Sequence, residues 1–315
     1  MDIFWILAAL CAAALLAVLI TAYICYRTAF YEPDRKPQSD DTFDIPKGRI
    51  YEPFRESIIN WTRETRAMPR EDMYITSFDG LKLHGRYYEY APGAPIELMM
   101  HGYRGAADRD LSGGVQRCFK LGRSALIVDQ RCSGESGGNV ITFGINEHRD
   151  CLSWVEHMIS RFGPDVKIIL TGISMGASTV LTAAGKPLPK NVIGVLADCG
   201  YDSAKNIIQK VIADMGLPPR LAYPFVKLGA RLFGHFDLEE NSPIEAVKKS
   251  RIPLVVIHGA TDDFVPTKMG ERIYDACQSK KKLYIVPNAA HGLAYPANPD
   301  EYVHVLHQAE LEWNL

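Results

Sequence analysis

The sequence lacks an excess of charge of either sign. Its 35 Lys and Arg residues nearly balance 37 Asp and Glu residues, for a formal net charge of −2 and a pI near 6.5. Binding to phosphates needs a basic surface, so nucleic acid is not an expected partner. With 47% apolar and 23% charged residues, the 315-residue chain can bury a substantial core. Small neutral or apolar molecules are the expected substrates.

Cysteine pairs at metal-binding or redox spacing are also absent. The seven cysteines are scattered and odd in number, and no C-x-x-C motif occurs. Neither a disulfide framework nor a zinc site is therefore predicted. No internal repeat or low-complexity tract is visible, which favours one catalytic-size domain with a short appendage.

The N-terminus has no Lys or Arg ahead of a long apolar run. The run from Ile3 to Tyr26 carries no charged residue, and about 20 apolar residues suffice to cross a bilayer as a helix. A cleaved signal peptide normally has a basic stretch before the apolar run, so residues 1–26 are predicted to be a permanent transmembrane anchor. Basic residues follow the run, which predicts a single-pass membrane protein with a cytoplasmic catalytic domain.

The rest of the chain divides into a tether and a domain. Residues 27–50 are rich in Pro, Asp, Lys and Ser without periodicity, which is typical of a tether. Residues 51–315 are expected to fold as one domain, opened by an amphipathic helix over 54–66. Short β-rich runs then alternate with helical patterns, which predicts a mostly parallel sheet covered by helices. Eight strands are expected, at 73–77, 83–88, 96–101, 125–129, 166–171, 192–197, 253–258 and 283–286.

One connection is too long for a plain crossover. The stretch between Asp198 and Arg251 carries three prolines and several aromatic residues. It is expected to form a helical cap over about residues 200–250, at the edge of the sheet where open α/β sheets place their sites. Its apolar residues are expected either to contact an acyl chain or to pack on the sheet.

A serine stands where a strand should turn into a helix. Residues 172–176 give G-x-S-x-G around Ser174, directly after an apolar strand and before a helix-forming run. Small residues on both sides let strand and helix approach, and the strained turn exposes the serine oxygen. The Met175 N–H would then lie at a helix N-terminus, where it can stabilise an oxyanion. A second match around Ser136 precedes no helix and is assigned to a loop.

A serine hydroxyl needs a base, and the base needs an orienting acid. His291 lies in a predicted loop between the last strand and the last helix, whereas His304 and His307 fall inside that helix and His258 ends a strand. For the acid, the residues leave three candidates beyond strand ends: Asp262, Asp263 and, less favoured, Asp198. In the loop after the third strand, the Tyr103 N–H is the candidate for a second oxyanion donor.

Taken together, these motifs resemble the α/β-hydrolase superfamily, and within it the bacterial membrane-anchored esterase-like serine hydrolases. The resemblance covers roughly residues 70–315, through His101-Gly102, 129–136, 172–176, 258–266 and 290–292. It singles out Asp262, because the usual pattern is H-G-x-x-D-x-x-V-P. Relatives often carry glycine at the position of Cys132. The resemblance implies Ser174, Asp262 and His291 as a catalytic triad that works without a cofactor.

The implied activity is cleavage of an apolar small-molecule ester through an acyl-enzyme intermediate. An aminopeptidase or a thioesterase would use the same triad on a different bond. A non-catalytic binding module on the same fold is the alternative from another class, against which the complete set of Ser, Asp and His residues argues.

Overall fold

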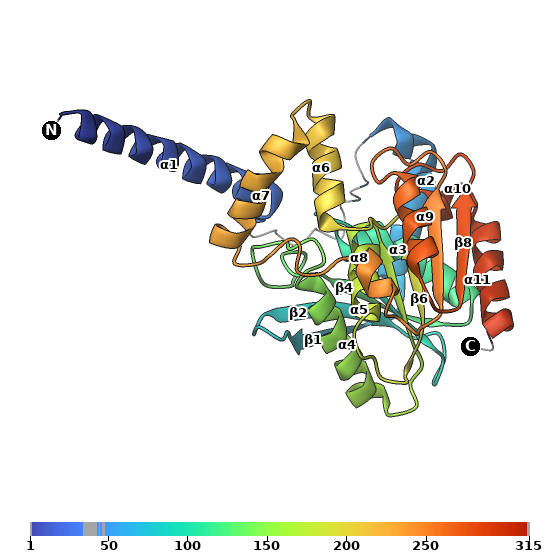
Figure 1. The fold of residues 1–315 in the computed structure, drawn as a ribbon. Helices are drawn as coiled ribbons and strands as arrows, with labels where there is room; N and C mark the ends of the chain where they lie inside the picture. The colour runs from blue at the N-terminus through green and yellow to red at the C-terminus, as the bar shows by residue number, and fades with distance from the viewer. Residues whose placement is uncertain (1, 34–42, 44, 46–47, 314–315) are drawn as a thin grey trace.

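The computed structural model describes residues 2–33, 43, 45 and 48–313 (Figure 1). One eight-stranded sheet forms the centre of the domain, in the order β1-β2-β4-β3-β5-β6-β7-β8. The strands are β1 (Glu71–Thr76), β2 (Lys82–Tyr88), β3 (Ile96–Met100), β4 (Ser124–Asp129), β5 (Ile168–Ile173), β6 (Val192–Asp198), β7 (Leu254–Gly259) and β8 (Lys281–Val286). The eight predicted strands are confirmed.

The sheet is mixed, which corrects the expectation of a mostly parallel one. β2 pairs antiparallel with β1 on one side and with β4 on the other, whereas the pairs from β4 to β8 are parallel. The turn after β1 reverses the chain, so β2 enters the sheet against its neighbours. Because the parallel strands end at one edge, the loops after β3, β5, β7 and β8 lie near one another there.

Helices cover both faces of the sheet (Figure 1). α4 (Glu147–Phe162), α5 (Met175–Ala184) and α9 (Thr267–Ala276) pack on one face, and α3 (Ala107–Lys120) and α11 (Pro299–Trp313) pack on the other. α2 (Arg55–Ala67) follows the short helix η1 (Arg49–Phe54) and packs against α3. The short helices α8 (Pro243–Val247) and α10 (Ala294–Ala297) complete the set.

Burial along the strands follows their positions in the sheet. β3 and β4 are buried at every residue, as strands covered by helices on both faces should be. The edge strand β1 exposes its first two residues and then alternates, because only one of its faces packs. α5 is buried along its whole length, which fixes the helix that begins directly after Ser174.

The predicted cap is formed by α6 (Ala204–Asp214) and α7 (Pro219–Phe233), which stand beyond the sheet (Figure 1). Tyr223, Val226 and Phe236 are buried there. They belong to a cluster that also contains Tyr26 and Phe30 from the N-terminal segment. Apolar cap residues therefore pack against the end of the N-terminal helix.

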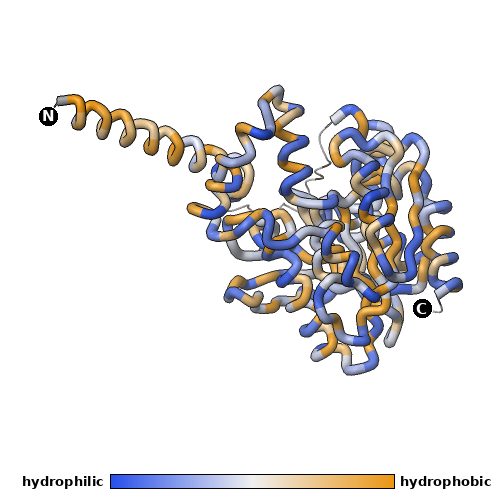
Figure 2. Tube along the Cα trace, in the orientation of Figure 1, coloured by the Kyte–Doolittle hydropathy of each residue, from blue (hydrophilic) through white to orange (hydrophobic). Residues whose placement is uncertain are grey.

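That helix, α1 (Asp2–Ala29), projects from the domain (Figure 1). Figure 2 shows it as apolar over most of its length, and its most apolar window has a mean hydropathy of 2.9 with no residue buried. Its last turns differ, since Ala22 is fully buried and Tyr26 is 8% exposed. α1 is long and apolar enough to cross a membrane.

The predicted tether begins inside folded structure. Residues 27–29 continue α1. Beyond the helix, the Glu32 N–H donates to Asn139 O, and the Ile141 N–H donates to Phe30 O. The Phe30 ring is fully buried, which explains why this part of the chain is held on the domain. Most of the remaining stretch to residue 50 lies outside the described residues.

Candidate active site

Ser174 occupies a sharp turn between β5 and α5. Its φ and ψ are 56° and −118°, a positive-φ conformation that costs a non-glycine residue about 1–3 kcal/mol. Two glycines permit the turn: a side chain on Gly172 would collide with the backbone of Gly176, and one on Gly176 would collide with the backbone of Met100. The strand, turn and helix expected around G-x-S-x-G are present. They hold the serine at the C-terminal end of β5, a central strand of the sheet.

His291 connects Ser174 to Asp262. Its Nε2 lies 2.9 Å from Ser174 Oγ, and its Nδ1 lies 2.7 Å from Asp262 Oδ2. The three residues come from the loops after β5, β7 and β8. Because these parallel strands end at one edge, residues up to 117 positions apart in the sequence meet in one row of hydrogen bonds.

The surroundings of Asp262 define its charge. Its Oδ1 accepts the backbone N–H groups of Phe264, at 3.1 Å, and Val265, at 2.8 Å. Burial by itself would raise the pKa of Asp262, but hydrogen bonds from His258 and His291 outweigh it and lower the pKa to about 2. The ionised carboxylate can only accept, so the proton of His291 stays on Nδ1 and Nε2 can accept the Ser174 proton.

His258 is a second support of the acid. Its Nε2 lies 2.8 Å from Val265 O and 3.3 Å from Asp262 Oδ2. A carbonyl oxygen can only accept, so Nε2 carries the proton and directs it at both oxygens. The sequence indicated a packed, hydrogen-bonded His258 but did not indicate its contact with Asp262. The available signal for this contact was the spacing of four residues between His258 and Asp262 across a tight turn.

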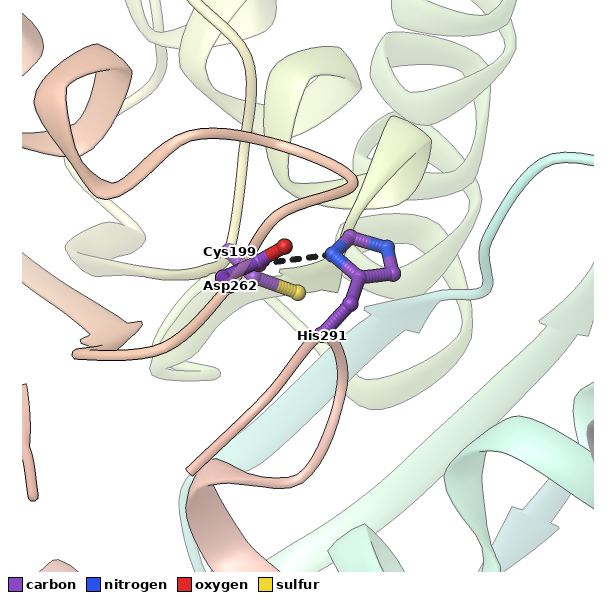
Figure 3. Close-up of side chains that lie close together, drawn as sticks. All are labelled: Cys199, Asp262 and His291. Atoms are coloured by element: carbon purple, nitrogen blue, oxygen red, sulfur yellow. Dashed lines mark hydrogen bonds and ion pairs between the residues drawn. The ribbon is translucent and has the colours of Figure 1, made fainter. Parts of the chain in front are cut away.

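Cys199 lies beside the Asp262 and His291 side chains (Figure 3). The ligand atoms of the three residues lie within 4.8 Å of one another, a spacing that can hold a metal ion. However, burial raises the pKa of the Cys199 thiol well above its usual range, and Asp262 and His291 are bonded to each other. Metal binding would have to break that bond and remove the thiol proton, so the contacts favour proton transfer.

The loop after β3 brings Tyr103 close to Ser174. A side chain on the adjacent Gly102 would place its Cβ 3.5 Å from the Ser174 Cβ, and Tyr103 and Ser174 line the same cavity. Met175 is the first residue of α5, so its N–H lies at a helix N-terminus. Two backbone N–H groups are expected to stabilise an oxyanion. That of Tyr103 belongs to the loop after β3, and that of Met175 belongs to α5.

The end of α1 holds the tip of this loop. The Tyr103 hydroxyl donates to Ala29 O at 2.9 Å, and Arg104 Nη2 donates to Thr28 O at 3.0 Å. Arg104 Nε also pairs with Glu32 at 2.6 Å. Arg104 has a positive φ of 49°, and these contacts stabilise the loop in that conformation. Nothing in the sequence alone links Arg104 to residues 28–32.

The second G-x-S-x-G match has a structural role. Ser136 lies in the loop after β4, where its Oγ donates to Asp129 O at 2.5 Å and accepts the His84 N–H at 2.9 Å. These bonds tie the loop to the β2–β4 pair. The next helix begins only at Glu147, so the assignment of Ser136 to a loop is confirmed.

The other candidate side chains are not members of this row of hydrogen bonds. Asp263 is exposed beside Asp262. Asp198 is buried and accepts from the Tyr302 hydroxyl at 2.9 Å, and burial raises its pKa. His304 and His307 lie on α11, and each has a polar neighbour on the same helix, as expected for a solvated face.

Cys132, the departure from the usual glycine, has a φ of 67°. Glycine adopts such a conformation without the steric cost that a side chain adds. The loop nevertheless closes, because the Cys132 N–H donates to Gly137 O at 2.9 Å. Burial raises the pKa of the thiol to about 12, so Cys132 is protonated at neutral pH and packs as a small apolar side chain.

A cavity of about 240 Å³ includes Ser174 and His291 in its lining. Apolar side chains from α2, β3 and the loop before α10 provide much of the remaining wall, namely Ile58, Trp61, Met99 and Leu293. Tyr51 of η1 also lines it, and its hydroxyl donates to His291 O at 3.1 Å. Among the described lining residues, none belongs to the cap. The sequence left open whether the apolar residues of the cap contact an acyl chain or pack on the sheet, and it did not indicate Tyr51 and Trp61 as lining residues.

Comparisons with known proteins identify the fold that carries these residues. The chain superimposes on the esterase Pf2001 of Pyrococcus furiosus with a TM-score of 0.64 and 24% identity, over 81% of this chain and 95% of the esterase. The chain has the α/β-hydrolase fold. An acylaminoacyl peptidase from Pyrococcus horikoshii shares this fold at 18% identity and a TM-score of 0.57, over 79% of this chain and 42% of the peptidase.

A curated relative of this chain is the uncharacterized protein YqkD of Bacillus subtilis. The two are 30% identical over 183 residues, which make up 58% of this chain and 60% of YqkD. The match therefore spans about three fifths of that relative. No family model matches the chain.

Proposed function

We propose that this protein is a membrane-anchored serine hydrolase that cleaves carboxylic esters through an acyl-enzyme intermediate. The observation that carries the proposal is the continuous row from Ser174 Oγ through both ring nitrogens of His291 to Asp262. A serine in a strained turn beside a histidine in the correct tautomer is the arrangement that acyl transfer needs.

In the proposed reaction, Ser174 Oγ attacks the ester carbonyl while His291 Nε2 takes its proton. The N–H groups of Tyr103 and Met175 stabilise the negative oxygen that forms. His291 then gives the proton to the departing alcohol, which leaves an acyl group on Ser174. Water, deprotonated by His291, attacks that acyl group, and the carboxylic acid is released as Ser174 regains its proton. The ionised Asp262 stabilises the charged imidazole in both steps.

The cavity supports a preference for short acyl groups. Its volume of about 240 Å³ falls below the roughly 300–1,000 Å³ of pockets that enclose a drug-sized ligand. Ile58, Trp61 and Met99 give it an apolar wall, which suits a hydrocarbon chain better than a charged one. α1 is proposed to hold this site at a membrane surface, with the domain in the cytoplasm.

A panel of chromogenic esters, thioesters and peptide amides tests the proposal on the full-length chain in detergent. We expect ester hydrolysis that falls as the acyl chain lengthens, and no hydrolysis by Ser174→Ala. Cleavage of amides or thioesters in preference to esters would replace the ester assignment with a peptidase or thioesterase. No turnover of any substrate by the native chain would favour a binding module.

A further inference from the structure

The last turns of α7 lie beside the last turns of α1. A side chain on Gly229 would collide with Ala22 O, so the two helices touch at this glycine. One turn further along α7, the Phe233 ring lies 5.1 Å from the ring of Tyr23 and 5.9 Å from that of Tyr26, measured between centroids. The C-terminal end of α7 is therefore level with residues 22–26 of α1.

The length of α1 sets where a bilayer surface must fall. α1 is exposed from Ile3 to Ala17, a stretch of about 22 Å at roughly 1.5 Å per residue. The hydrocarbon core of a bilayer is about 30 Å thick and needs about 20 helical residues. Because the charged residues Asp2 and Arg27 bound the uncharged part of α1, the hydrocarbon core of a bilayer crossed by α1 ends between about Ala22 and Tyr26. Its surface falls where α1 meets Gly229 and Phe233.

α7 carries an apolar stripe and a basic face. One side of the helix carries four apolar residues at spacings of four, three and four, namely Leu221, Phe225, Leu228 and Leu232. Leu221 is 69% exposed and Leu232 is 43% exposed, so protein covers neither end of the stripe. The charged residues of α7 are all basic and share a second side, namely Arg220, Lys227 and Arg231.

We propose that the C-terminal half of α7 rests in the headgroup region of the bilayer that α1 crosses. Leu228 and Leu232 would contact lipid, and Arg231 would lie among phosphates, which is the arrangement of an interfacial amphipathic helix. The inference rests on the membrane anchor in the proposed function. It makes the cap a second membrane contact of the domain, beside the one at α1.

Thiol accessibility in the full-length protein tests this contact. Leu232→Cys is compared with Leu311→Cys on α11, where the leucine is 65% exposed. Both variants are placed in nanodiscs of mixed zwitterionic and anionic phospholipid at one copy per disc, and reacted with a sulfonated maleimide. Site-resolved peptide mass spectrometry reads each thiol separately. Native Cys11, exposed in the middle of α1, reports whether the span is inserted.

We expect Leu232→Cys to react at least ten times more slowly than Leu311→Cys, with Cys11 unlabelled, and Leu228→Cys to be protected as well. Equal rates with Cys11 protected would overturn the α7 contact while sparing the anchor. Labelling of Cys11 would overturn both. Protection of Leu232→Cys only in discs that hold two copies would assign the surface to a second copy. Ester hydrolysis measured on the same samples reports failure of the hydrolase proposal separately.

Discussion

Replacing Asp262 with Asn should invert the tautomer of His291. Two backbone N–H groups, from Phe264 and Val265, point at Oδ1 of Asp262, so the oxygen of an Asn side chain must stay there. Its NH₂ group then faces His291 Nδ1, which can only accept. The proton of His291 moves to Nε2, and Nε2 can no longer take the proton of Ser174.

The size of this effect follows from the loss of general-base catalysis. In a triad of this arrangement, an Asp-to-Asn change that preserves geometry lowers kcat about 10⁴-fold, which is about 5.5 kcal/mol of transition-state stabilisation. In Asp262→Asn, the NH₂ group also meets the Nε2–H of His258, which lies 3.3 Å from Asp262 Oδ2 in the native protein. Two donors then face each other, so the loss should not be smaller.

The assay is steady-state hydrolysis of a short-chain p-nitrophenyl ester by the full-length protein in detergent. Asp263→Asn is the matched control, because Asp263 is the neighbouring carboxylate and is exposed. We expect Asp263→Asn to retain kcat within about twofold. If Asp262→Asn kept kcat within tenfold of the native value while Ser174→Ala abolished it, the assignment of Asp262 as the orienting acid would be wrong.

Three other parts of the molecule give measurable predictions. Glu97 is buried between Arg117 and Arg123, so Glu97→Gln should lower the free energy of unfolding by about 3–5 kcal/mol in a denaturant titration; an unchanged midpoint would contradict this. Burial would raise the pKa of Glu97, but the two arginines lower it from 4.5 to about 2. Its stabilising contribution is therefore complete above pH 4.5 and lost as the pH falls toward 2. Glu97→Gln should lack this dependence of the free energy of unfolding on pH. Arg104→Ala, by loosening the loop of Tyr103, should lower kcat about 10- to 100-fold with little change in KM; a change confined to KM would argue against a role in positioning. Protease added outside intact cells should leave the domain undigested, and its digestion would refute the cytoplasmic orientation.

Local patterns made the surroundings of Ser174 predictable. The turn needs an apolar strand, two glycines at fixed spacing and a helix-forming run, and all of these lie within residues 168–184. The decoy at Ser136 could be set aside for the same reason, because no helix-forming run follows it. The strands could be counted because each is a short apolar run between turn residues.

Contacts between distant segments could not be predicted in the same way. The support of Tyr103 by Ala29 and the approach of Tyr51 to His291 join residues more than 70 positions apart. Composition indicated a tether for residues 27–50, yet Phe30 packs between Phe143 and Phe236, which only the folded chain brings together. The hairpin pattern predicts that β2 pairs with β1. It does not predict that β2 also pairs with β4, which depends on the whole sheet.

Labelling with a fluorophosphonate tests the activated serine most directly. The full-length chain, Ser174→Ala and Ser136→Ala are treated in parallel at neutral pH, and the modified peptide is located by mass spectrometry. Because Ser136 shares the G-x-S-x-G pattern but bonds to Asp129 O, it controls for reactivity that comes from the pattern alone. We expect one adduct, on Ser174, in the native chain and in Ser136→Ala, and none in Ser174→Ala. No adduct on the native chain, or one that persists in Ser174→Ala, would contradict an activated Ser174.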